Sequence, residues 1–193
     1  MKDYSTKISL ILKCKQEEIP GVLKLCEEHI SKEIIETDPI HRPLESTIMA
    51  KIKWVISEML LNAVKHSGVD NCLLKIMIDE KQLTIVKEDL GKPLVLNDFD
   101  TGKRINWPLK ETAGNLNFQI YHNGMDSLRV RTDTRNKATF FIVQLPDVEM
   151  PGLLVDISEH FGLLIIAKAS DEFTYEMDPY TNANRFISNF NLK

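Results

Sequence analysis

The sequence predicts an α+β fold, in which helices form one layer on one face of a mixed, mainly antiparallel sheet. We expect this two-layer sandwich to carry a small α/β extension at its C-terminal end. Alternating apolar residues predict strands, and apolar residues at three- and four-residue spacing predict helices. Their order along the chain is strand, helix, helix, strand, strand, long loop, helix, strand, strand.

The first third of the chain predicts one strand and two helices. Apolar residues alternate from residue 7 to residue 14, as in a strand. Acidic residues and Pro20 then mark a helix start, and an apolar stripe continues to about residue 34. After a loop with two prolines, residues 45–66 show the spacing of a long helix, and Gly68 is well placed to cap its end.

The middle of the chain predicts a hairpin followed by a long irregular stretch. Residues 72–79 and 83–87 alternate on either side of a short polar turn, which favours two paired strands. Residues 94–114 carry little regular signal, and a loop of that length in a compact domain is usually functional. We expect a short helix over residues 115–122.

A second strand pair completes the predicted main domain, residues 1–146. Residues 128–130 and 139–145 alternate around a polar turn, as in an antiparallel pair. A linker-like stretch follows, so residues 147–193 are assigned to a C-terminal extension of unknown role. Within it the pattern predicts four short elements: a helix over 153–160, strands over 163–168 and 173–177, and a helix over 180–190.

Composition and charge argue against several classes of function. Hydrophobic residues make up 43% of the 193 residues and charged residues 27%, as in ordinary globular proteins. The net charge of −4 and the lack of a long Lys/Arg run argue against a nucleic-acid partner. The longest apolar runs are too short to span a bilayer, and the charged start does not resemble a signal peptide. We therefore expect a cytoplasmic protein with no membrane partner.

The three cysteines, Cys14, Cys26 and Cys72, are far apart and lie in apolar-patterned segments. No two of them have the close spacing that is typical of a metal site. We expect all three to be buried as small apolar side chains, which fits a reducing compartment.

The most informative stretch is the second half of the long predicted helix. Glu58 and Asn62 are four residues apart and so share one face, and Lys65 and His66 follow one turn later. In phosphoryl transfer a carboxylate can act as base, an amide oxygen can bind Mg²⁺, and a cation can stabilise phosphate oxygens. The same residues are also compatible with the solvated face of an amphipathic helix.

A second informative element is Asp89-Leu90-Gly91, directly after a predicted strand. An acidic side chain at a strand end can accept a hydrogen bond from a ligand's amino group, and the glycine lets the backbone turn tightly. Asp-x-Gly is also a common turn in proteins that bind no ligand there.

Together these elements resemble the GHKL superfamily of ATPases, in its histidine-kinase-like group that includes the anti-sigma-factor serine kinases. The run Ser57–Ser67 matches the family's first motif, Glu-x-x-x-Asn-Ala-x-x-His. Asp89 and Gly91 match the second motif, Asp-x-Gly-x-Gly. Gly114 stands where a glycine pair should precede a helix, and Thr139 stands in the Gly-Thr step that opens the last strand.

The resemblance covers about residues 5–145 and implies a Bergerat ATP-binding fold with ATP and Mg²⁺ as cofactors. Residues 94–114 would form the ATP lid. The resemblance also implies these single roles: Glu58 as general base, Asn62 as Mg²⁺ ligand, Lys65 and His66 near the phosphates, Asp89 as acceptor for the adenine amino group, Gly91 close to the purine, Gly114 in the lid motif, and Thr139 in support of Asp89.

Two departures from the family pattern concern its glycines. Pro93 replaces the last glycine of the second motif, and its ring fixes φ and removes an N–H group. Asn115-Leu116 lacks the second glycine of the third motif. Backbone N–H groups at a helix start still favour phosphate, although a side chain there can block its close approach.

Three functional hypotheses follow. The first is an ATP-binding regulatory module that transfers a phosphoryl group to a serine of a regulatory partner protein, of the sigma-factor or antagonist type, in bacterial signalling. The second is a non-catalytic interaction module that keeps the fold but has lost ATP turnover. The third is an unrelated α+β protein with chance motif matches. The sequence leaves a homodimer open.

Overall fold

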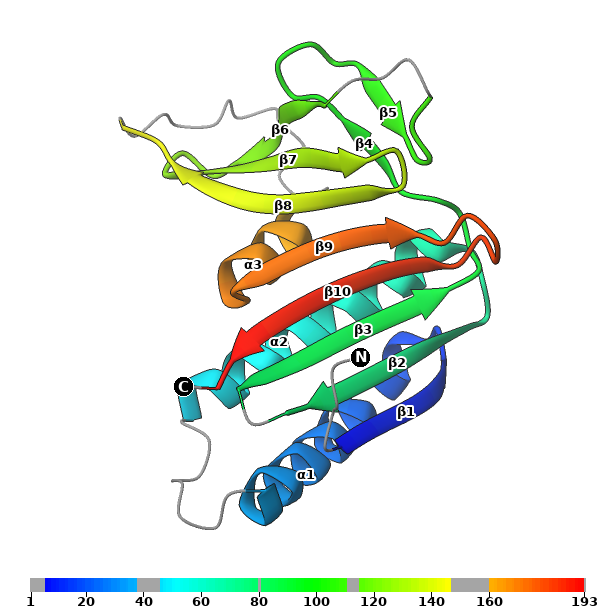
Figure 1. The fold of residues 1–193 in the computed structure, drawn as a ribbon, viewed down its shortest axis with the longest axis vertical. Helices are drawn as coiled ribbons and strands as arrows, with labels where there is room; N and C mark the ends of the chain where they lie inside the picture. The colour runs from blue at the N-terminus through cyan, green and yellow to red at the C-terminus, as the bar shows by residue number, and fades with distance from the viewer. Residues whose placement is uncertain (1–5, 38–45, 80, 111–114, 147–159, 193) are drawn as a thin grey trace.

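The computed structural model describes residues 6–37, 46–79, 81–110, 115–146 and 160–192 of the chain. Within these residues one large sheet and three helices make up most of the molecule (Figure 1). The predictions for Gly114 and for a helix over residues 153–159 therefore lie outside the described part.

The large sheet has eight strands, and every neighbouring pair is antiparallel. Its order across the sheet is β1-β2-β3-β10-β9-β8-β7-β6 (Figure 1). The strands are β1 Thr6–Lys13, β2 Asn71–Ile78, β3 Gln82–Asp89, β6 Asn117–His122, β7 Asp126–Thr134, β8 Lys137–Gln144, β9 Glu172–Met177 and β10 Asn184–Asn191. A separate two-stranded hairpin consists of β4 Val95–Asn97 and β5 Arg104–Asn106.

Three α-helices lie behind the part of the sheet that runs from β1 to β9, whereas β6 and β7 extend beyond them (Figure 1). They are α1 Ile19–Thr37, which follows a single 3-10 turn, α2 Ser46–Asn62, and α3 Phe161–Ala169. α2 continues into a π-helical turn, Ala63–Ser67, and ends at Gly68. Gly68 adopts a left-handed φ of 69°, which glycine reaches without the steric cost that a Cβ brings.

The core lies between α2 and the strands in front of it. Side chains of α2 that recur at helical spacing, such as Ile52, Ile56 and Met59, are buried together with every second residue of β2. Burying one such side chain stabilises the fold by about 1.5–3 kcal/mol. This packing fixes the orientation of α2. It therefore also fixes the direction in which the polar residues on the other face of the helix project.

The observed sheet corrects the predicted fold class. The sheet is wholly antiparallel rather than mixed, and its eight strands, not a helical layer, dominate the described residues. β9 and β10, which the sequence assigns to a C-terminal extension, pair with β8 and β3 in the middle of the sheet. The predicted two-layer sandwich of Bergerat type with a separate extension is therefore wrong.

Three predicted elements have the opposite secondary structure, and each is short, with 6, 9 and 8 residues respectively. Residues 117–122 form β6 rather than a helix, residues 161–169 form α3 rather than a strand, and residues 184–191 form β10 rather than a helix. Of the three, only α3 is a nearly continuous apolar run, and such a run does not distinguish a buried helix from a buried strand. The pairing of β10 with strands on both sides is a tertiary effect that local sequence does not report.

The longer elements agree with their predictions. The first strand, the first two helices, the β2–β3 hairpin, the β7–β8 pair and β9 are all confirmed within a few residues at their ends. Within the described part of the chain, no helix is long and apolar enough to cross a membrane.

Candidate functional site

The polar face of α2 meets the first turn of α3, and this contact defines the α2–α3 junction. Glu58 and Asn62 are both half-buried on α2, and Gly162 is the second residue of α3. A methyl group added to Gly162 would lie 2.5 Å from Glu58 Oε2 and 3.6 Å from Asn62 Oδ1. Position 162 therefore allows this close approach because it carries no side chain.

The surroundings of Glu58 at this junction disfavour its charged form. Partial burial removes water from its carboxylate and raises its pKa above the ordinary value, while the positive charge of Lys65 acts in the opposite direction. The start of α3 beside it carries backbone N–H groups without partners inside the helix, which favour negative charge. The junction thus combines a carboxylate, an amide oxygen and a helix N-terminus.

Basic side chains surround the nearby end of α2. Lys65 and His66 are exposed on the π-helical turn. The side chain of Lys92 approaches the same end, because its Cε would lie 3.5 Å from a methyl group built on Gly68. The structure thus places the predicted phosphate residues beside the end of α2, although both extend into solvent.

The environment of Asp89 is very different, because this carboxylate is buried and paired. Lys87 Nζ donates to Asp89 Oδ2 at 2.5 Å, and the two side chains are 3% and 2% exposed. The other carboxylate oxygen, Oδ1, accepts a hydrogen bond of 2.8 Å from the backbone N–H of Gly91. Lys87 also lies over the ring of Phe186, 4.6 Å from its centroid. Both oxygens of Asp89 are thus already bonded within the protein.

Asn184 and Tyr175 complete this group of residues, which we call the Asp89 network. Asn184 lies opposite Asp89 in the sheet, and its Nδ2 donates to Gly91 O at 3.0 Å and to Asp89 Oδ1 at 3.5 Å. The hydroxyl of Tyr175 donates to Asn184 Oδ1 at 2.6 Å. Burial raises the pKa of Tyr175 to about 12, so this hydroxyl stays protonated at neutral pH and keeps donating.

Gly91 joins the Asp89 network to the end of α2. A methyl group at this position would lie only 2.2 Å from the carbonyl oxygen of Ser67, and the next residue, Lys92, donates its backbone N–H to the same oxygen at 2.9 Å. The glycine predicted to lie close to a purine instead lies close to the backbone of the α2 terminus. Its lack of a side chain is thus explained by the fold itself.

Thr139 does not reach Asp89, which corrects the role that the resemblance implies for it. It lies on β8, where it pairs in register with Thr174 of β9 and donates its hydroxyl to Asp133 at 2.5 Å. β9 and β10 separate β8 from β3 and its Asp89. The residue that contacts Asp89 across the sheet is Asn184.

The predicted lid is a packed hairpin over its described residues, 94–110. Its buried side chains are Leu96, Ile105, Trp107 and Leu109. The backbone N–H of Leu94 donates to the Tyr175 hydroxyl at 3.2 Å, and the ring of Trp107 packs edge-on against Tyr175 with centroids 6.1 Å apart. The hairpin is therefore tied to the Asp89 network.

Sequence reasoning missed four residues of these two groups: Lys87, Gly162, Tyr175 and Asn184. In the family that the sequence resembles, a glycine precedes a helix, and two strands follow that helix. A similar order occurs here, with Gly162 as the second residue of α3 and with β9 and β10 after it, but the strand prediction for residues 163–168 concealed it. Lys87 had no signal at all, because a lysine two residues before an aspartate on a strand looks like a solvated side chain.

The described residues contain no group of three or more His, Cys, Asp or Glu side chains that could hold a metal ion. No protein-family model matches the chain, and no curated protein matches it either. We therefore infer the function from the geometry of the chain's own residues.

Proposed function

We propose that this chain is an ATP-binding regulatory module, which binds ATP with Mg²⁺ at the α2–α3 junction and transfers a phosphoryl group to a partner protein in bacterial signalling. The observation that carries the proposal is the approach of Gly162 to Glu58 and Asn62. It brings a base, a metal-binding oxygen and a helix N-terminus to one place, and each of these groups can serve in phosphoryl transfer. We place this activity in the cytoplasm.

Membership of the GHKL superfamily is part of this proposal, and the motifs support it rather than the sheet. A related order, of a glycine in the first turn of a helix followed by two strands, occurs from Gly162 to the end of β10, with Gly162 inside α3 rather than before it. When β10 is matched to the family's last strand, Asn184 takes the role that the resemblance gives to Thr139, because Asn184 opens this strand and contacts Asp89.

Each residue at the junction has a distinct role in the proposed reaction. Glu58, with its raised pKa, would accept the proton of the attacking serine hydroxyl. Asn62 Oδ1 would bind Mg²⁺, whose charge offsets that of the phosphates. The first N–H groups of α3 around Gly162 would hold phosphate oxygens, with Lys65 and His66 adding positive charge.

The first experiment is a calorimetric titration with a non-hydrolysable ATP analogue, with and without Mg²⁺. We expect saturable binding that requires Mg²⁺ and that Asn62→Ala weakens at least tenfold. Asn191→Ala removes an exposed amide from the end of β10, outside residues 94–114, and is the matched control, which should bind as the unaltered chain does. Absence of binding by the folded protein would refute the proposal.

Catalysis requires a second measurement, because binding alone does not establish transfer. Glu58→Gln should retain analogue binding and lose phosphoryl transfer to the partner by about a hundredfold or more. Glu17→Gln, which alters an exposed carboxylate near the start of α1, should leave both unchanged. Equal turnover in Glu58→Gln and the unaltered chain would exclude Glu58 as the base.

The alternative is a non-catalytic interaction module, and the Asp89 network favours it. Both carboxylate oxygens of Asp89 are engaged by Lys87, Gly91 and Asn184, so the proposed acceptor for an adenine amino group is occupied within the protein. If the titration shows no binding, a search for a regulatory protein partner becomes the next step. In that case Asn62→Ala should leave partner binding unchanged.

A further inference from the structure

Cys14 and Cys72 lie on one face of two adjacent strands, although 58 positions separate them in the sequence. Cys72 lies opposite Leu12 in the register of β1 and β2, and the backbone N–H of Cys14 donates to Asp70 O at 2.8 Å. Residues two apart on a strand point to the same side, so the two cysteines are diagonal neighbours. The expectation that all three cysteines are buried is met by Cys26 and Cys72, whereas Cys14 is half-buried.

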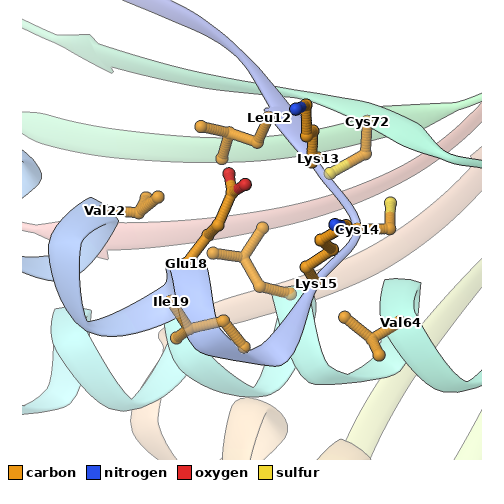
Figure 2. A pocket seen from close by; sticks show the side chains of 10 residues that line it. Leu12, Lys13, Cys14, Lys15, Glu18, Ile19, Val22, Val64 and Cys72 are labelled. Atoms are coloured by element: carbon orange, nitrogen blue, oxygen red, sulfur yellow. The ribbon is translucent and has the colours of Figure 1, made fainter.

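The two thiols are close enough to interact. Burial, and then the neighbouring thiol of Cys14 with a hydrogen bond between the two groups, raise the pKa of Cys72 to about 12. Figure 2 shows both side chains at the same wall of a cavity, one from the end of β1 and the other from β2. Cys72 is buried and Cys14 is half-buried, so the two differ in access from solvent.

The cavity beside the thiols gives them room to change conformation. Its volume is about 10 Å³, and its lining also includes Ile19 of α1 and Leu60 and Val64 at the end of α2. Diagonal Cα atoms in a sheet are about 7–8 Å apart, whereas a disulfide needs roughly 4.4–6.8 Å. Cys14 follows the last residue of β1, so a small backbone shift there stretches its hydrogen bond to Asp70 O but leaves the ladder from Thr6 to Lys13 in place.

We propose that Cys14 and Cys72 form a peroxide-sensitive thiol pair that closes into a reversible disulfide between the end of β1 and β2. The oxidant that reacts with this pair is a small hydroperoxide such as H₂O₂. In the reducing compartment that the sequence leads us to expect, disulfides are usually transient and report on oxidants. This inference does not depend on nucleotide binding.

The proposed oxidation has two balanced steps. The Cys14 thiolate attacks one peroxide oxygen, an S–O bond forms, the O–O bond breaks, and the leaving hydroxide takes a proton to become water. Cys72 sulfur then attacks Cys14 sulfur, the S–S bond forms, and the S–O bond breaks, while the Cys72 proton leaves with the hydroxide as water. Two thiols lose two electrons, and one peroxide is reduced to two waters.

Cys26 is the natural control within the same chain. Its thiol is buried on α1, and burial alone raises its pKa to about 11. It shares burial with Cys72 but has no second thiol among the causes of its shift. Cys26 should therefore remain a free thiol under conditions that oxidise Cys14.

The test is to expose the purified full chain to dilute H₂O₂, block free thiols in denaturant, and map the peptides by mass spectrometry. The number of free thiols should fall from the three in the sequence to one, with Cys14 linked to Cys72 in the monomer. Dithiothreitol should restore all three. Cys26→Ser should still form the bond, whereas Cys72→Ser should stop at sulfenic or sulfinic acid on Cys14.

Three results would overturn the proposal: sulfinic acid on Cys14 of the unaltered chain without a link to Cys72, dimers cross-linked through Cys14, or oxidation of Cys26 as fast as Cys14. The peptide map of the unaltered chain decides among them even if a cysteine variant does not fold. Loss of ATP-analogue binding in the first experiment would leave this outcome unaffected.

Discussion

The α2–α3 junction and the Asp89 network each contain a carboxylate, yet the surroundings of the two carboxylates are opposite. Glu58 is half-buried, has a raised pKa and faces a glycine at a helix start. Asp89 is almost fully buried and has a lysine, a backbone N–H group and an asparagine as partners. A carboxylate with a raised pKa is suited to ligand binding or proton transfer. A carboxylate whose oxygens are hydrogen-bonded within the protein is suited to a structural role.

Removing Lys87 should have the largest effect on stability. Lys87→Met leaves the Asp89 carboxylate buried without its cation, and breaking such a pair costs about 3–5 kcal/mol. Urea unfolding should show the loss. Lys75→Met is the matched control, since Lys75 pairs with Glu88 at 3.4 Å where both side chains are partly exposed, and it should cost less than about 1 kcal/mol. Equal losses for the two variants would mean that the Asp89 pair is not structurally special.

The glycine of the Asp89 network gives the second test. Gly91→Ala places a methyl group 2.2 Å from a backbone carbonyl oxygen, which can move only with the end of α2. Overpacking of this kind costs about 1–3 kcal/mol. Thermal or urea unfolding will measure it. In Gly21→Ala, where nothing lies within 4 Å, the same change inside α1 should instead stabilise the chain by about 0.5–1 kcal/mol.

The glycine of the α2–α3 junction should behave differently from Gly91. The methyl group of Gly162→Ala would meet the end of the Glu58 side chain, which can rotate away, so the stability cost should not exceed about 1 kcal/mol. Displacement of Glu58 and crowding of the helix start should weaken binding of the Mg²⁺–ATP analogue about tenfold, or ~1.4 kcal/mol. Unchanged affinity in calorimetry would argue against a ligand at this junction.

Glu58 itself should make the smallest contribution to stability, and a pH-dependent one. Because its folded pKa lies above the ordinary value of 4.5, the folded state holds this proton more tightly, and the native chain loses stability as pH rises through that window. Glu58→Gln carries no such penalty. It should be slightly more stable than the native chain at neutral pH, with the difference disappearing once the pH falls below the ordinary Glu pKa of 4.5. A constant difference from pH 4 to 7 would contradict the assigned shift.

The sequence predicted the parts of the site that a single element contains, and missed those that depend on pairing between distant segments. Glu58 and Asn62 lie on one long helix, whose periodicity fixes their common face. Asn184 reaches Asp89 only because β10 pairs with β3, across 95 positions of sequence. The same pairing explains the wrong fold class, since the eight residues of β10, five of them polar, do not reveal with which strands they will pair.

The central position of β9 and β10 has a consequence for how the chain is made. These two strands join a sheet of β1, β2 and β3 to a sheet of β8, β7 and β6, and the chain supplies them only after residue 171. During synthesis from the N-terminus, β3 and β8 therefore remain open strand edges while the rest of both halves can already fold. Open edges of this kind can pair with other chains. The nascent protein is thus most prone to aggregation just before β9 and β10 emerge, and dilution or a chaperone at that stage should raise the yield of folded protein.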